Sequence, residues 1–274
     1  MLRRLVLLGS ACALFAASGF AEDSGCGSLP NQAKLKAALM AATNEEGSGL
    51  NMNMWGTIVD RDGIVCAVAF TGKNRGAQWP GSRVISAQKA NTANSFSLDP
   101  SAASGGNGGP LALSTANLYS AVQPGGSLFG LQESNPVDTS VAYKGPSSNF
   151  GGTNDPMVGS KIGGVNVFGG GLALYNQNHE IVGAIGVSGD TSCADHNIAW
   201  RTRHNLELDH LGYPVPVIPG PASIFAGDPA HPDNIIYDII SNPGGGTGRS
   251  DSGFGHPSCL NQTTIPTTLP DVRL

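Results

Sequence analysis

Charged residues are scarce in this chain of 274 residues. They make up 13% of the sequence, about half of the ~25% typical of globular proteins. Since disordered chains combine low hydrophobicity with high net charge, a hydrophobic fraction of 40% and a net charge of -5 indicate a folded protein. No basic run is longer than Arg3-Arg4, so the chain lacks the positive surface that binds phosphate backbones. We predict that it does not bind nucleic acid.

The chain also lacks an apolar run of the ~20 residues that a transmembrane helix needs. Its main apolar run, residues 5–17, is shorter, follows Arg3 and Arg4, and leads to small residues ending at Ala21. This order is typical of a secretory signal peptide. We therefore predict that residues 1–21 are cleaved off near Ala21, that no membrane span remains, and that the protein is periplasmic or secreted.

Cleavage would leave the four cysteines Cys26, Cys66, Cys193 and Cys259. No C-x2-C pair occurs among them, which argues against a zinc site. In an oxidising compartment they are candidates for disulfides, and three pairings are possible. We favour Cys26 with Cys259, which would tie the two ends together, and Cys66 with Cys193.

The hydrophobic pattern predicts three helices and two β-hairpins. Helices are expected over residues 28–43, 82–96 and 190–208. Strands are expected over residues 55–59, 64–70, 165–175 and 181–188. This element order favours a single α+β domain in which helices flank one antiparallel sheet.

The domain is expected to occupy residues 22–210, with residues 98–164 as an insertion rich in loops. Residues 211–274 form a C-terminal extension rich in proline and glycine, which holds ten of the 18 prolines. We expect this extension either to pack on the domain or to be disordered.

The helix over residues 82–96 carries two cations, Arg83 and Lys89, among small, amide and apolar side chains. Lys89 and Thr92 share a helix face with Phe96, which would give an apolar wall with one ammonium and one hydroxyl group. We predict that this face borders a ligand cleft, closed by the strand that ends at Ser188. The alternative is a lysine whose stem packs while its head reaches solvent.

The start of the last helix is a second candidate binding position. Free backbone N–H groups near residues 190–195 would suit a carboxylate. His196 and His204 lie on one face of this helix but about 12 Å apart along its axis, too far to share one ion. His196 alone could be an axial ligand of a haem iron, the alternative being a surface or interface imidazole. The G-x-S-x-G motif of serine hydrolases fails at Asp190, and we predict no catalytic residue.

Two segments resemble the GlcG/HbpS family, which includes the C-terminal domain of PduO. They are Trp79–Ala93 and Gly183–Asp190, the latter read together with Ala194-Asp195. The resemblance spans about residues 29–210. It implies a profilin-like α/β/α sandwich, assembly into homo-oligomers, and haem binding in place of catalysis.

On this resemblance, the haem propionates would meet Arg83, Lys89 or the start of the last helix near Asp195. The iron would be bound by His196 or by a weaker oxygen ligand such as Thr92, or haem would not bind. Residues 29–96 contain no histidine.

Three functions therefore stay open. The first is an exported, non-enzymatic protein that binds haem or another tetrapyrrole. The second is an oligomeric binding or sensor domain for another small acidic or aromatic metabolite. The third is an enzyme that uses Lys89 as acid or base.

Overall fold

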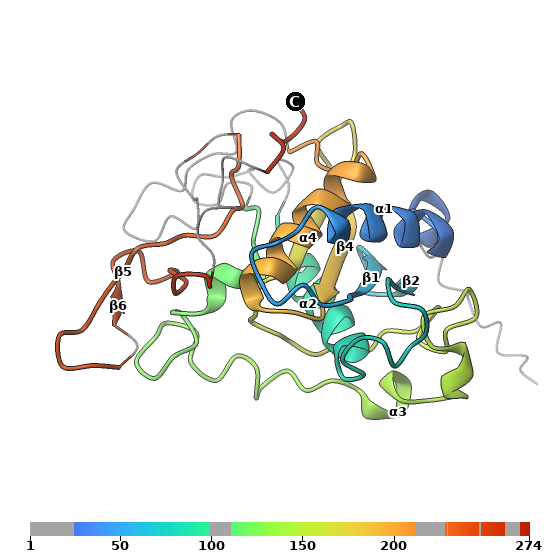
Figure 1. Cartoon of the computed structure of the whole chain (residues 1–274), viewed down its shortest axis with the longest axis horizontal. Coiled ribbons are helices and arrows are strands. Elements are labelled where there is room, and N and C mark those ends of the chain that lie inside the picture. The colour runs from blue at the N-terminus through green and yellow to red at the C-terminus, as the bar shows by residue number, and fades with distance from the viewer. Residues whose placement is uncertain (1–24, 99–110, 212–227, 229, 247, 261–268) are drawn as a thin grey trace, which may run out of the picture.

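The computed structural model describes residues 25–98, 111–211, 228, 230–246, 248–260 and 269–274. The predicted signal peptide lies outside these residues. The described residues form helices, strands and short 3-10 helices (η), labelled as in Figure 1. In chain order they are η1 (Gly25–Ser28), α1 (Gln32–Asn44), β1 (Trp55–Asp60), β2 (Val65–Phe70), α2 (Ser82–Phe96), η3 (Thr115–Leu118), α3 (Thr139–Ala142), η4 (Ser147–Asn149), β3 (Gly171–Tyr175), β4 (Ile181–Ser188), α4 (Ser192–Asn205), β5 (Ile239–Ile240) and β6 (Arg249–Ser250).

Both predicted hairpins are present, and their strands form one antiparallel sheet in the order β2-β1-β4-β3. The first hairpin turns at Asp60, whose carboxylate accepts hydrogen bonds from the backbone N–H groups of Asp62 and Ile64. Gly63 completes the turn with φ 79°, a backbone conformation that glycine adopts without strain. The central strands are buried on both faces because helices cover each side of the sheet.

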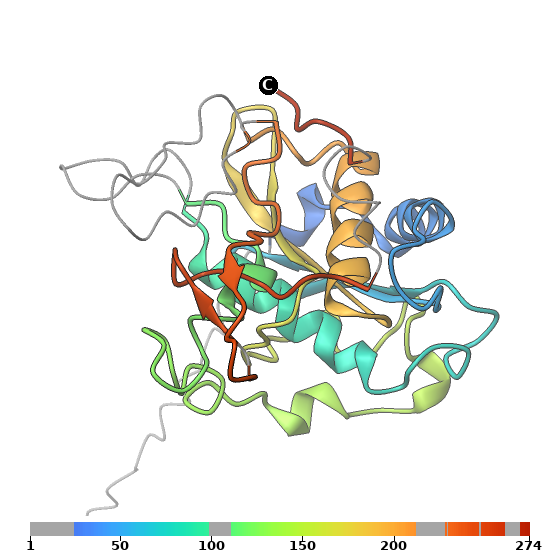
Figure 2. The ribbon, with the colours of Figure 1, turned by 60° about the vertical axis from the view of Figure 1, so that its left-hand side comes forward.

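Helices α1 and α4 lie side by side on one face of the sheet, and α2 lies on the other (Figures 1 and 2). On the first face, Leu39 of α1 packs against Gly56 and joins a core cluster with Ile58. On the second face, Ala87 and other small residues of α2 pack against valines of β1 and β2. The fold is therefore the predicted α/β/α sandwich.

Helix α1 begins later than the sequence indicates. Asn31 caps it through a hydrogen bond from Lys34 N to its side chain, 3.0 Å long, and Ser28 belongs to η1 instead. Thr191 caps α4 in the same way, by accepting from Ala194 N. Asparagine and threonine suit these positions because a short side-chain oxygen can satisfy a free N–H group of the first turn.

The close approach of α2 to β4 depends on Gly186. A Cβ atom at this position would collide with the backbone carbonyl oxygen of Ser86 in α2. Because a backbone atom of a packed helix cannot move aside cheaply, we expect Gly186→Ala to lower the free energy of unfolding by about 3 kcal/mol, the upper part of the overpacking range. Urea unfolding measures the change, with Gly27→Ala as the control, since no atom lies within 4 Å of a Cβ at Gly27. Equal stability of the two variants would contradict this account.

All four candidate cysteines form disulfides, but the favoured pairing is wrong. The bonds join Cys26 to Cys66 and Cys193 to Cys259, with Cα–Cα distances of 5.2 and 5.9 Å. Cys66 lies on β2, an edge strand that β1 separates from β4, whereas Cys193 opens α4. The first disulfide therefore ties η1 to the edge strand β2. The second ties the C-terminal extension to the start of α4. The carboxylate of Asp60 lies beside the Cys26–Cys66 disulfide. The two sulfur atoms are bonded to each other, so they are not thiolate ligands for a metal ion at this position.

The described part of the C-terminal extension packs on the domain. Arg203 of α4 is fully buried and forms a bidentate ion pair with Asp233. Its two terminal guanidinium nitrogens lie 2.6 and 2.8 Å from the two carboxylate oxygens. Trp200 donates its indole N–H to the carbonyl of Pro270, and Val272 joins the core cluster below α4. The extension therefore completes the layer that contains α4. Among the residues described, no helix is long and apolar enough to span a bilayer.

Candidate functional site

The predicted cleft beside α2 is replaced by a packed junction. Lys89 is 1% exposed, and its Nζ atom lies 2.7 Å from Asp195 Oδ2 and 3.0 Å from the Val187 carbonyl oxygen. The other carboxylate oxygen of Asp195 accepts from Asp190 N. Lys89 thus links α2, the end of β4 and α4 inside the protein, and its partner is a carboxylate of the same chain.

Burial dominates the protonation of this pair. Loss of hydration lowers the pKa of Lys89 and raises that of Asp195 to about 6, while their mutual attraction opposes both changes. The side chains of Lys89 and Asp195 are hydrogen bonded to each other, so each has its partner within the protein. A buried lysine that is already paired cannot reach a substrate in this conformation.

Arg83 is also occupied. Its side chain is 2% exposed, and its Nε lies 2.8 Å from Asp155 Oδ2, while a second nitrogen contacts the other carboxylate oxygen. Its remaining nitrogen donates to the carbonyl of Ala142, and the guanidinium lies 3.7 Å from the ring centre of Phe150. Arg83 therefore anchors the segment between α3 and residue 155 and is not free to bind a propionate.

Three further candidates on the α2 side are structural in this conformation. Thr92 is buried, donates to Gln88 O and accepts from Asn166 N. Phe96 is half-buried in a small apolar cluster. Ser188 is 4% exposed at the end of β4, where it pairs with Trp55. None of the three lines either of the two clefts described below.

His196 is fully buried. Its two ring nitrogens lie 3.1 Å from Ser114 Oγ and 3.1 Å from Asn234 Oδ1, which belongs to the C-terminal extension. Burial lowers its pKa to about 4, so the imidazole is neutral. This environment could not be predicted, because the extension that covers His196 has no periodic pattern. An iron ligand at this position would require the extension to move away.

An open cleft lies elsewhere, at the end of the sheet where α2 begins. Its volume is about 840 Å³, within the ~300–1,000 Å³ range of ligand sites. We call it the aromatic cleft, and its lining residues are Trp55, Asn74, Arg75, Gly76, Pro80, Gly81, Tyr143, Ser147 and Phe150. Apart from Trp55, these residues come from two segments, one between β2 and α2 and the other after α3, which includes the start of η4. The cleft could not be predicted, because loop residues show no periodicity.

The walls of the aromatic cleft combine a rigid floor with an exposed rim. Trp55 is 1% exposed and packs edge-on against Phe70, with ring centres 5.2 Å apart. Phe150 is held by Arg83, as described above, whereas Tyr143 is 60% exposed. The indole Nε1 of Trp55 is buried and has no hydrogen-bond partner among the described residues. Such an orphan donor costs stability, which an acceptor on a ligand could restore.

Positive charge lies at one side of the aromatic cleft. Arg75 is exposed there and takes part in no ion pair with another described residue. Gly81, the N-cap of α2, also lines the cleft and offers no side chain to cap the helix. An unpaired guanidinium next to a helix N-terminus favours an anionic group on a ligand. The arrangement suits a flat apolar molecule that carries a carboxylate.

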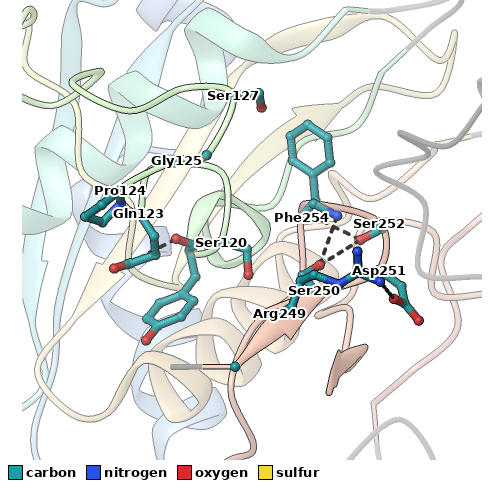
Figure 3. Close-up of a pocket in the computed structure, with 14 residues that line it drawn as sticks. Ser120, Gln123, Pro124, Gly125, Ser127, Arg249, Ser250, Asp251, Ser252 and Phe254 are labelled. Carbon is teal, nitrogen blue, oxygen red and sulfur yellow. Dashed lines mark hydrogen bonds and ion pairs between the residues drawn. The ribbon is translucent and has the colours of Figure 1, made fainter. Parts of the chain in front are cut away.

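A second cleft, of about 510 Å³, lies between residues 119–127 and the β6 region (Figure 3). Its charged groups, Arg249 and Asp251, are exposed and pair with each other at 3.1 Å. The hydroxyl of Ser250 accepts hydrogen bonds from the backbone of its own turn and so is occupied. Because its charged groups pair with each other and its Ser250 hydroxyl is hydrogen bonded to the backbone, this cleft is the weaker candidate for a ligand site.

Comparison with known proteins identifies the family. The model of the family described as "Haem degrading protein HbpS-like" matches residues 31–203. Similar solved structures include a Klebsiella pneumoniae protein named ORFY, with 25% identity, 64% of this chain and 86% of that chain covered, and a TM-score of 0.40. Another is a PduOC:heme complex, with 20% identity, 63% and 89% coverage and a TM-score of 0.41. No curated protein matches significantly. Since the family match covers more than half of the sequence, the chain belongs to the HbpS-like haem degrading protein family.

Proposed function

We propose that the protein binds haem or a closely related tetrapyrrole in the aromatic cleft. The observation that carries this proposal is the cleft itself, a space of about 840 Å³ with aromatic walls and one unpaired cation. Membership of a family described as haem degrading supports the choice of ligand. We further propose that residues 1–21 direct export and that the protein works as a homo-oligomer.

The residues of the cleft fit the chemistry of this ligand. A porphyrin is flat and apolar, so it can pack against Phe150 and Tyr143, whereas its propionates need positive partners such as Arg75. The buried Nε1 of Trp55 adds one donor without a partner among the described residues. Haem, when bound, supplies its own redox and oxygen chemistry, and the protein contributes binding and orientation.

We propose binding, and not acid–base catalysis by the chain, as the main role of these residues. Lys89 supports this choice, because its ammonium is buried against Asp195 and lines no described cleft. The competing function, binding of another aromatic acid, requires the same cleft and differs only in its ligand.

Titration with hemin tests the proposal. We expect a saturable change in the Soret band, and we expect Arg75→Glu to weaken binding about fivefold, because the interaction of a propionate with an exposed charge is worth about 1 kcal/mol. Arg249→Glu is the matched control, since Arg249 is an exposed arginine of the second cleft.

Two results would contradict the proposal. Absence of a saturable Soret change in the wild type would exclude haem as a ligand, and thermal stabilisation by aromatic acids would then favour the competing function. Weakening by Arg249→Glu but not by Arg75→Glu would place the ligand in the second cleft.

A further inference from the structure

We propose that Tyr143 binds the haem iron through its phenolate oxygen. This inference rests on the proposed function and adds to it the identity of the iron ligand. It differs from the ligands expected from the sequence, His196 and Thr92, both of which are buried and hydrogen bonded.

The composition of the aromatic cleft leaves one candidate. Proteins bind haem iron mainly through histidine, cysteine thiolate, methionine or tyrosine. Among the residues that line the cleft, Tyr143 alone belongs to these types. The four cysteines of the described chain are used up in disulfides.

The histidines are held in other parts of the protein. His196 is buried against the C-terminal extension, and His231 and His256 are buried within that extension. His204 pairs with Asp209 beyond the end of α4. The last two, His179 and His210, lie at the tip of the β3–β4 hairpin and on the segment that it contacts. An iron atom in the aromatic cleft therefore finds no histidine among the residues that line it.

The backbone around Tyr143 is fixed while its ring is free. Asp138 caps α3 with its side chain, and the carbonyl of Ala142 accepts a hydrogen bond from Arg83 at 2.8 Å. Gly145 then turns the chain with φ 72°, which brings Ser147 and Phe150 to the same cleft. The phenol of Tyr143 has no hydrogen-bond partner among the described residues, and its 60% exposure leaves it accessible. Its backbone is therefore fixed by hydrogen bonds, and its phenol oxygen is unused and open to a metal.

Coordination needs no oxidant or reductant. A bond forms between the Tyr143 oxygen and ferric iron, the phenolic O–H bond breaks, and the proton passes to solvent. The charge of the metal favours loss of this proton, as it does for other coordinating groups. Arg75 lines the same cleft and adds a second positive charge to it.

The test compares hemin with metal-free protoporphyrin IX in Tyr143→Phe. The variant keeps the aromatic ring but loses the ligand atom. We expect its affinity for hemin to fall about tenfold or more, while its affinity for protoporphyrin IX stays within about twofold of wild type. We also expect the resonance Raman bands of an iron-bound phenolate in the wild-type hemin complex and their loss in the variant. Tyr119→Phe, a substitution in the second cleft, should change neither the affinity for hemin nor these Raman bands.

The outcomes separate this inference from the proposed function. If wild type and Tyr143→Phe bind hemin with the same affinity and the same spectrum, Tyr143 is not the ligand, although haem binding stands. If the wild type binds neither hemin nor protoporphyrin IX, both proposals fail. Loss of hemin affinity with protoporphyrin IX affinity retained supports the assignment.

Discussion

Replacement of Lys89 by methionine should lower the free energy of unfolding by about 3–5 kcal/mol, because it leaves the Asp195 carboxylate buried without its partner. Asp195 is 2% exposed, so water cannot take the place of the lost ammonium. Methionine keeps much of the lysine stem's volume, which limits the contribution of a cavity. Urea unfolding of the wild type and the variant at pH 7 measures the difference.

The double variant Lys89→Met, Asp195→Asn is the matched control. It removes both charges and retains an oxygen that can accept from Asp190 N. Because neutral replacement of a buried pair costs far less than loss of one partner, we expect most of the stability to return. If the single and double variants are equally unstable, the lysine stem contributes more than the ion pair, and the role given to this junction is wrong.

The second large effect concerns pH and His196. Its pKa is lowered from 6.5 to about 4 in the folded protein, so the unfolded chain binds a proton at this residue more readily than the folded one. Stability from neutral, buried His196 is therefore complete above pH 6.5 and is lost as the pH falls toward 4. The pKa difference corresponds to about 3 kcal/mol.

Asp195 acts in the opposite direction over nearly the same range, since its pKa is raised to about 6. The difference in stability between wild type and His196→Gln isolates the effect of His196, because the contribution of Asp195 cancels. We expect the destabilisation caused by this substitution to shrink by about 3 kcal/mol between pH 7 and pH 4. A pH-independent difference between the two proteins would show that His196 is not buried in its neutral form.

Much of the sandwich could be predicted from local patterns. The apolar runs over residues 55–59, 64–70, 165–175 and 181–188 indicate two hairpins, and the pattern over residues 82–96 indicates a helix. These elements are confirmed, because each depends on neighbouring residues. The face of that helix predicted to border a cleft packs against β4 instead, where Gly186 allows the close approach.

The site could be predicted only in part, because its contacts join distant segments. The sequence showed that Lys89 needs a partner, but the partner is Asp195, which follows 106 residues later. An ammonium beside an apolar helix face looks the same in the sequence whether a ligand or a carboxylate neutralises it. The aromatic cleft was missed for a related reason, since Arg75 and Tyr143 belong to irregular loops that only the folded chain brings together.

The packing of Leu269 and Val272 into the core cluster has a consequence for biosynthesis. These two side chains leave the ribosome after the sheet and all the long helices have been translated. Until they arrive, Trp200 lacks its acceptor at Pro270 and α4 keeps an apolar side uncovered. A nascent chain of this protein can therefore form its hairpins early, but it cannot complete the core cluster beside α4 before residues 269–272 have emerged.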